Sequence, residues 1–225
     1  MIGQDDIQGH WQRNWLRAPG VEDTTTRVHW MQAGSMYADL RIPEERPELG
    51  STPCLAALPS AALKMLARAE GFAGTTQIVD GICTWQRVIN WHGATDQIDA
   101  GKLALKDGAL IEDGVHSDYR ELWQRRAEGP AFGQKLTGDG FTAYLVSVSD
   151  AFIFGAGRPD TPGDAPYDAL FERVHALGSW VGEVGMADIA TDPFLEGQPL
   201  LRRRTDGFLW HRINFRGRSS WVALT

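Results

Sequence analysis

The sequence has few cysteines and no long apolar run. Among its 225 residues only Cys54 and Cys83 are cysteine, and they lack the spacing of a metal site. No stretch approaches the roughly 18 consecutive apolar residues that a membrane-spanning helix requires. The first residues contain neither the basic region nor the apolar region of a signal peptide. We therefore expect a cytoplasmic protein with reduced thiols and no membrane partner.

The sequence also lacks an excess of positive charge. It contains 22 Lys and Arg residues against 29 Asp and Glu residues, for a formal net charge of −7. Nucleic acid is bound by basic surfaces, so we expect no nucleic-acid partner. The chain has no P-loop, dinucleotide fingerprint or nucleophile elbow, and no pair of histidines with the spacing of metal ligands. The sequence therefore predicts no cofactor and no metal site.

Tryptophan, by contrast, is abundant, with nine residues. Its side chain fits a pleated surface, fills large core spaces and can line a ligand pocket. Short β-forming stretches alternate with turn signals along the chain at the spacing of a barrel or sandwich. Only residues 61–70 and 167–177 show helical spacing. We predict a mainly β protein built as one or more antiparallel barrels, with roughly ten strands and one or two short helices.

The clearest local prediction is a β-hairpin formed by residues 24–32 and 36–42. Alternation divides its side chains between two faces. The polar face holds Val28, Trp30, Gln32, Tyr37, Asp39 and Arg41, and the apolar face holds His29, Met31, Ala38, Leu40 and Ile42. In a simple barrel the apolar face points inward and the polar face is solvated. In a ligand-binding barrel this orientation inverts, and the polar face would orient a carboxylate or carbonyl.

A tripeptide of Trp, then Gln or His, then Arg occurs more often than chance predicts. On a strand, residues i and i+2 share a face, so each copy places an indole beside a guanidinium. Stacking of the two groups contributes about 0.5–2 kcal/mol. The motif therefore indicates either a structural ladder or the wall of a pocket. Its four copies are Trp11-Gln12-Arg13, Trp85-Gln86-Arg87, Trp123-Gln124-Arg125 and Trp210-His211-Arg212.

The first copy of this motif is preceded by glycine, which gives Gly9-x-Trp11. With this pattern the chain resembles the calycin superfamily, which includes lipocalins and fatty-acid-binding proteins. In that superfamily an arginine from the final strand packs over the tryptophan and closes the barrel. The resemblance implies that Arg212 or Arg216 plays this part. The chain differs from extracellular lipocalins because it lacks a signal peptide and a disulfide pattern.

The copies at Trp11 and Trp85 are compatible with an internal duplication. Within a single compact β-barrel unit spanning residues 1–225, the pseudo-repeat halves would be residues 1–74 and 75–225. Such an arrangement is similar to a fungal family of intracellular double calycin-like barrels. The sequence is also compatible with a homodimer.

Three functions remain open at this point. The first is binding of a small apolar or aromatic molecule in a barrel pocket, which requires a cavity. The second is an enzyme for acid–base isomerisation, dehydration or cyclisation, which requires a histidine or carboxylate with a shifted pKa facing that cavity. Histidines His29, His92 and His211 lie on predicted strands. The third is a protein–protein interaction module without a ligand, with a filled core and an exposed apolar patch.

The candidate ligand-binding residues are aromatic, charged and polar side chains from these predicted strands. No catalytic residue is assigned. The candidates are Trp30, Tyr37, Asp39, Arg41, Trp85, Arg87, Trp91, Tyr119, Trp123 and His211.

Overall fold

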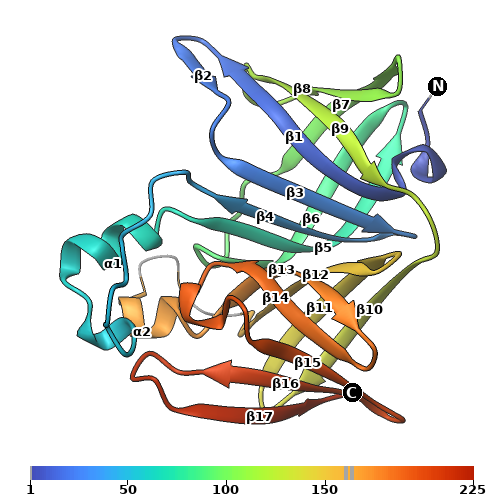
Figure 1. Cartoon of the computed structure of the whole chain (residues 1–225). Coiled ribbons are helices and arrows are strands. Elements are labelled where there is room, and N and C mark those ends of the chain that lie inside the picture. Colours follow the sequence, from blue (N-terminus) through green and yellow to red (C-terminus); the bar gives the residue numbers. More distant parts are fainter. Residues whose placement is uncertain (1, 160–161, 163–164) are drawn as a thin grey trace.

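The computed structural model describes residues 2–159, 162 and 165–225, and this part of the chain is mainly β (Figure 1). Its strands form two antiparallel, barrel-like sheets, which confirms the predicted fold class. The described residues contain seventeen strands, more than the roughly ten expected. The additional strands include β2 (Val21–Asp23), β10 (Ala131–Gly138) and β15 (Pro199–Arg204). These segments are short, glycine-containing or arginine-rich, so their sequences carry little β-forming pattern.

The first sheet closes into a barrel, which we call barrel 1. Besides β2 it contains β1 (Gly9–Ala18), β3 (Arg27–Ala33), β4 (Met36–Ile42), β5 (Glu70–Val79), β6 (Ile82–Asn90), β7 (Asp99–Lys106), β8 (Ala109–Gly114) and β9 (Arg120–Ala127). The strands pair in the order β2-β1-β3-β4-β5-β6-β7-β8-β9. A further pairing of β1 with β9 closes the ring and leaves β2 at its outside.

The second sheet, called barrel 2, is an antiparallel meander of eight strands. It continues from β10 and β15 with β11 (Phe141–Val148), β12 (Ala151–Gly157), β13 (Val174–Val181), β14 (Val184–Ala190), β16 (Gly207–Ile213) and β17 (Ser219–Leu224). The backbones of Thr137 and Thr225 exchange hydrogen bonds of 2.9 and 3.0 Å, which brings β10 beside the end of the chain. The sheet therefore curls toward closure.

The division between the two sheets lies at residues 128–130, between β9 and β10. The boundary expected at residues 74 and 75 falls inside β5, so it does not separate the barrels. β3 and β4 of barrel 1 pack against β11 and β12 of barrel 2 (Figure 1). Buried apolar side chains fill this contact, among them Met31, Ala38, Val146 and Ile153.

The predicted hairpin forms as β3 and β4, with Trp30 opposite Asp39 and Gln32 opposite Tyr37. Its polar face points into barrel 1, where Trp30 and Tyr37 join the buried cluster. The expectation of a solvated polar face is therefore wrong. The apolar face points out of barrel 1 and is buried there because barrel 2 packs on it.

The helices are shorter than predicted. α1 (Ser60–Leu66) begins after Pro59 and covers the first part of the expected segment 61–70. α2 (Tyr167–Leu170) ends early because the residues from Val174 onward pair with β12 and β14 as strand β13. Short 3₁₀ turns are η1 (Gln4–Ile7), η2 (Leu55–Ala57) and η3 (Pro193–Leu195). Among the described residues, no helix is both long and apolar enough to cross a membrane.

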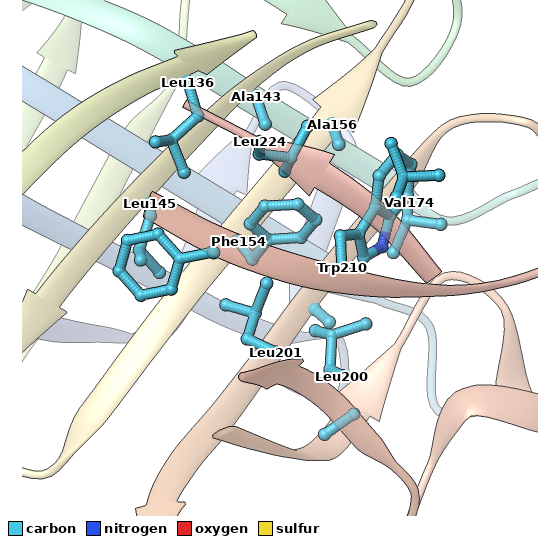
Figure 2. Close-up of a cluster of buried hydrophobic side chains, with 14 of the residues drawn as sticks. Leu136, Ala143, Leu145, Phe154, Ala156, Val174, Leu200, Leu201, Trp210 and Leu224 are labelled. Atoms are coloured by element: carbon cyan, nitrogen blue, oxygen red, sulfur yellow. The ribbon is translucent and has the colours of Figure 1, made fainter. Parts of the chain in front are cut away.

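Barrel 2 is filled by apolar side chains (Figure 2). Phe154 and Trp210 lie at its centre with ring centroids 5.4 Å apart, and Leu200 and Leu201 pack below them. The second large ring against Trp210 is Phe141, at 5.3 Å. This packing fixes barrel 2 as a solid body against which barrel 1 is held.

Candidate functional site

Two adjoining cavities occupy barrel 1, and both are lined by Arg41 and Asp99. The inner cavity has a volume of about 10 Å³, which is room for a single water molecule. Its wall consists of Trp30, Tyr37, Asp39, Arg41, Phe72, Trp85, Asp99, Glu112 and Trp123. The outer cavity has a volume of about 200 Å³. Its wall consists of Leu16, Arg41, Arg87, Gln97, Ile98, Asp99, Ser117, Tyr119 and Glu121.

The inner wall is aromatic. Trp30 packs edge-to-face against Trp85 and Trp123, with ring centroids 5.6 and 5.8 Å apart. The Arg87 guanidinium lies 3.5 Å from the centroid of the Phe72 ring, and that of Arg41 lies 5.2 Å from it. The guanidinium groups of Arg41 and Arg87 therefore lie between the aromatic wall of the inner cavity and the outer cavity.

Ion pairs hold these cations in place. Arg41 donates to Asp39 at 2.9 Å and lies 3.9 Å from Glu121. Arg87 donates to one oxygen of Asp99 through two nitrogens, at 2.6 and 3.0 Å. Arg41, Arg87, Asp99 and Glu121 line the same outer cavity, and we call these groups with Asp39 the charged network of barrel 1.

A third arginine enters the network from β1. Arg13 donates to Glu121 at 2.7 Å and also pairs with Asp23 at the end of β2. The side chains of Arg13 and Glu121 are almost completely buried. Because the pair is buried, removal of either side chain would leave the charge of the other poorly compensated.

Two buried glutamates face each other across β8 and β9. Glu112 and Glu121 are direct partners in the strand register, an arrangement that disfavours two negative charges. Glu112 accepts hydrogen bonds from Tyr119 Oη at 2.7 Å and from Trp123 Nε1 at 3.1 Å. Glu121 is held by arginines instead. Glu112 therefore accepts hydrogen bonds from uncharged donors, whereas Glu121 pairs with cations.

Burial shifts the protonation of this site. It raises the pKa of Glu112 well above its ordinary value, and the negative charge of Glu121 raises it further, although the Tyr119 hydrogen bond opposes the shift. Burial also raises the pKa of Asp39, while Arg41 lowers it in part. The site thus holds more carboxyl groups than its cations can keep ionised.

Two buried polar atoms beside the cavities have no hydrogen-bond partner among the described residues. They are Tyr37 Oη, in the wall of the inner cavity, and Glu121 Oε2, in the wall of the outer cavity. Burial of a polar atom without a partner costs about 1–3 kcal/mol. A ligand or water molecule that supplied a hydrogen-bond donor to either atom would remove this cost.

The structure brings eight of the ten predicted site residues to these two cavities. Trp91 lies elsewhere, packed against Phe171 under α1 and α2. His211 is on the outside of barrel 2, where Nδ1 contacts the Pro199 carbonyl and the ring stacks on Trp221. The cavity walls contain the other eight: Trp30, Tyr37, Asp39, Arg41, Trp85, Arg87, Tyr119 and Trp123.

The strand histidines do not reach the cavities. His29 lies on the other face of β3, with its Nδ1 3.0 Å from His10 Nε2. Burial lowers the pKa of His10 to about 3 and that of His29 to about 4, so both rings are neutral near neutral pH. His92 is exposed in the turn after β6. Acid–base chemistry in the cavities would therefore depend on carboxyl groups.

The four Trp-x-Arg copies do not form one ladder. The guanidinium of Arg125 on β9 stacks 4.2 Å from the Trp11 ring and donates to the carbonyl of Asp6 at 2.9 Å. Arg212 and Arg216, expected over Trp11, both lie in barrel 2, so that assignment is wrong. The first barrel closes on its own ninth strand, because the chain builds two barrels instead of one.

The main site residues missed from the sequence are Phe72, Asp99, Glu112 and Glu121. The sequence does carry one usable signal, because Glu121 precedes Trp123 by two residues and must share its face on a strand. Glu112 requires the register of β8 against β9, and Asp99 requires the pairing of β6 with β7. These depend on tertiary structure.

No protein-family model matches the sequence, and no curated protein is significantly similar to it. Among solved structures, the chain is similar to the crystal structure of an uncharacterized protein, YLR301w, from Saccharomyces cerevisiae. The two are 10% identical, the alignment covers 97% of this chain and 85% of that chain, and the TM-score is 0.49. Within the described part of this chain, no group of three or more His, Cys, Asp or Glu side chains is arranged to hold a metal ion.

Proposed function

We propose that this is a cytoplasmic protein that binds a small aromatic molecule in the outer cavity of barrel 1. The observation that carries the proposal is the buried, unpartnered Glu121 Oε2 in the wall of the outer cavity, and the unpartnered Tyr37 Oη lies in the wall of the adjoining inner cavity. A ligand with a hydrogen-bond donor satisfies such an atom and removes its desolvation cost. The free thiols of Cys54 and Cys83 are consistent with a reducing compartment.

The size of the outer cavity limits the ligand. Its volume of about 200 Å³ is below the range of about 300–1,000 Å³ typical of pockets for drug-sized molecules. Leu16 and Ile98 supply apolar contacts in the wall, and Tyr119 adds an aromatic ring. These features favour a single small ring with a short polar arm.

The calycin resemblance also becomes a proposal for barrel 1 alone. Trp11 donates from Nε1 to the Ile7 carbonyl at 2.8 Å, and Arg125 covers its ring. Arg125 comes from the strand that closes the barrel on β1. In this reading η1 and Arg125 seal one end of barrel 1, and the cavities lie toward the other.

Fluorescence titration with a library of small aromatic compounds tests the binding proposal. Trp85 lines the inner cavity, whereas Trp210 is buried in barrel 2. A bound ligand should alter tryptophan emission, and Trp85→Phe should reduce that response while Trp210→Phe retains it. A response that depends on Trp210 and not on Trp85 would place binding outside barrel 1 and refute the proposal.

Acid–base catalysis is the second candidate function, and the Glu112–Glu121 pair favours it. A carboxyl that keeps its proton to a raised pKa, beside a second carboxylate, is the arrangement of a general acid with a general base. If bound ligands are converted, Glu112→Gln should abolish turnover and preserve binding. Turnover unaffected by that change would exclude Glu112 as the acid.

A further inference from the structure

Acidic groups outnumber cations inside barrel 1. The network contains three guanidinium groups, Arg13, Arg41 and Arg87, and its four buried or half-buried carboxyl groups are Asp39, Asp99, Glu112 and Glu121. Two further carboxylates, those of Asp23 and Glu70, lie at the margin of the network and pair with the same arginines. The interior therefore has more acidic groups than cations to pair with them.

Each arginine is already engaged. Arg41 is held by Asp39 at 2.9 Å, and Arg87 is held by Asp99 at 2.6 Å. An anionic ligand would have to displace one of these carboxylates, in an interior that already has more acidic groups than cations. Of the two groups that the polar face of the hairpin is expected to orient, a carboxylate or a carbonyl, the pairing therefore disfavours the carboxylate.

The acceptor that remains is a carboxylate oxygen. Glu121 Oε1 takes the Arg13 hydrogen bond, whereas Oε2 is buried without a partner among the described residues. The Glu121 side chain is only 2% exposed, yet it lines the outer cavity. A buried ionised acceptor is matched best by a charged donor, since charge-assisted hydrogen bonds are about twice as strong as neutral ones.

From these observations we infer that the ligand of barrel 1 is a small organic cation, a primary or secondary ammonium on an aromatic or apolar body. Its N–H group donates to Glu121 Oε2 and faces Asp99, and its body packs against Leu16 and Ile98 toward the open end of the outer cavity. The inference rests on the proposed function and specifies its ligand class. The cation supplies the hydrogen-bond donor that Glu121 Oε2 lacks among the described residues.

Three probes of similar size and different charge test the inference on the intact protein. They are 2-phenylethylamine, which is a cation near neutral pH, 2-phenylethanol, which is neutral, and 3-phenylpropanoate, which is an anion. We expect calorimetric titration to show the amine binding about tenfold or more tightly than the alcohol, the factor that a charge-assisted hydrogen bond provides. The carboxylate should bind most weakly.

Glu121→Gln should remove most of the preference for the amine and leave the weak affinity for the alcohol nearly unchanged. Asp113→Asn is the matched control, because Asp113 is an exposed carboxylate on the same barrel that pairs with Arg120 outside the cavities. It should change amine binding less than about twofold. If Glu121→Gln does not fold, Asp99→Asn removes the second carboxylate of the same cavity at a half-buried position and should also weaken the amine selectively.

The outcomes separate this inference from the proposed function. The alcohol or the carboxylate could instead bind as tightly as the amine or more tightly, and lose that binding when the cavity is altered. This result would refute the cationic ligand but not the binding site. Failure of all three probes to bind would overturn the cation inference, and the proposed function would fall only if the wider aromatic library also failed.

Discussion

The two barrels are built from similar antiparallel meanders, and their interiors differ in kind. Barrel 2 is filled by Phe154, Trp210 and their apolar neighbours, with no charged side chain in that cluster of described residues (Figure 2). Barrel 1 has an aromatic layer beside a network of arginines and carboxyls, and it contains the two partly open cavities described above. One chain thus contains a barrel whose interior is filled by apolar side chains and a barrel whose interior keeps cavities and charged groups.

Stability alone does not account for the interior of barrel 1. Replacement of a buried ion pair by apolar side chains of similar size is often neutral or stabilising. Barrel 2 shows that this sequence can fill a barrel with apolar groups. The retained charges of Arg13, Arg41 and Glu121 therefore support a binding role, in which barrel 2 is the scaffold that holds β3 and β4 from behind.

The largest effect should come from opening a cavity in barrel 2. Phe154 is fully buried against Trp210, so Phe154→Ala should lower the free energy of unfolding by about 3–5 kcal/mol. Denaturant titration measures this loss. Ligand affinity of the fraction that remains folded should be unchanged, because the ring does not line either cavity. A loss below about 1 kcal/mol would show that barrel 2 is not the filled scaffold described above.

The contrast between the barrels also explains what the sequence could predict. Alternation along residues 24–42 predicts the hairpin and the composition of its two faces, because strand geometry is local. It cannot tell which face points inward, since that depends on a second barrel packing on Met31 and Ala38. The β13 segment has helical spacing in sequence and forms a strand because β12 and β14 offer hydrogen-bonding edges. Local pattern thus predicts an element where strand geometry decides it, and fails where pairing with neighbouring strands decides it.

Coupling between the barrels should be visible at Gly71. A Cβ atom at this position of β5 would lie 2.2 Å from Cγ of His175, which β13 of barrel 2 holds in a fully buried place. Gly71→Ala should therefore destabilise the protein by about 1–3 kcal/mol through overpacking. Unfolding followed at a tryptophan in each barrel should shift by the same amount for both. A shift confined to one barrel would show that they unfold independently.

The excess of carboxyl groups in barrel 1 predicts a pH dependence. The folded state keeps the proton of Glu112 to a higher pH than the unfolded state, where the ordinary pKa is 4.5. This contribution to stability is therefore complete below pH 4.5 and is lost as the pH rises through the raised pKa. Glu112→Gln cannot titrate, so it should remove up to about 1.4 kcal/mol per pH unit from the slope in that range.

Urea unfolding at several pH values measures this slope, and Asp113→Asn again serves as the control because its carboxylate is exposed. A slope that is the same in Glu112→Gln and in the unchanged protein would mean that Glu112 is ionised in the folded state. Barrel 1 would then hold one more buried negative charge, and the raised pKa attributed to the burial of Glu112 would be wrong.

The smallest effect on stability is expected at the hydroxyl of Tyr37, and its sign is informative. The oxygen is buried in the inner wall of barrel 1 and has no partner among the described residues. Tyr37→Phe removes an unsatisfied polar atom and keeps the ring, so the free energy of unfolding should stay within about 1 kcal/mol or rise. Loss of ligand affinity in this variant, with stability retained, would show that the hydroxyl serves binding. A clear loss of stability without ligand would show instead that the hydroxyl has a hydrogen-bond partner within the fold. Glu121 Oε2 would then be the unpartnered buried atom that remains beside the cavities.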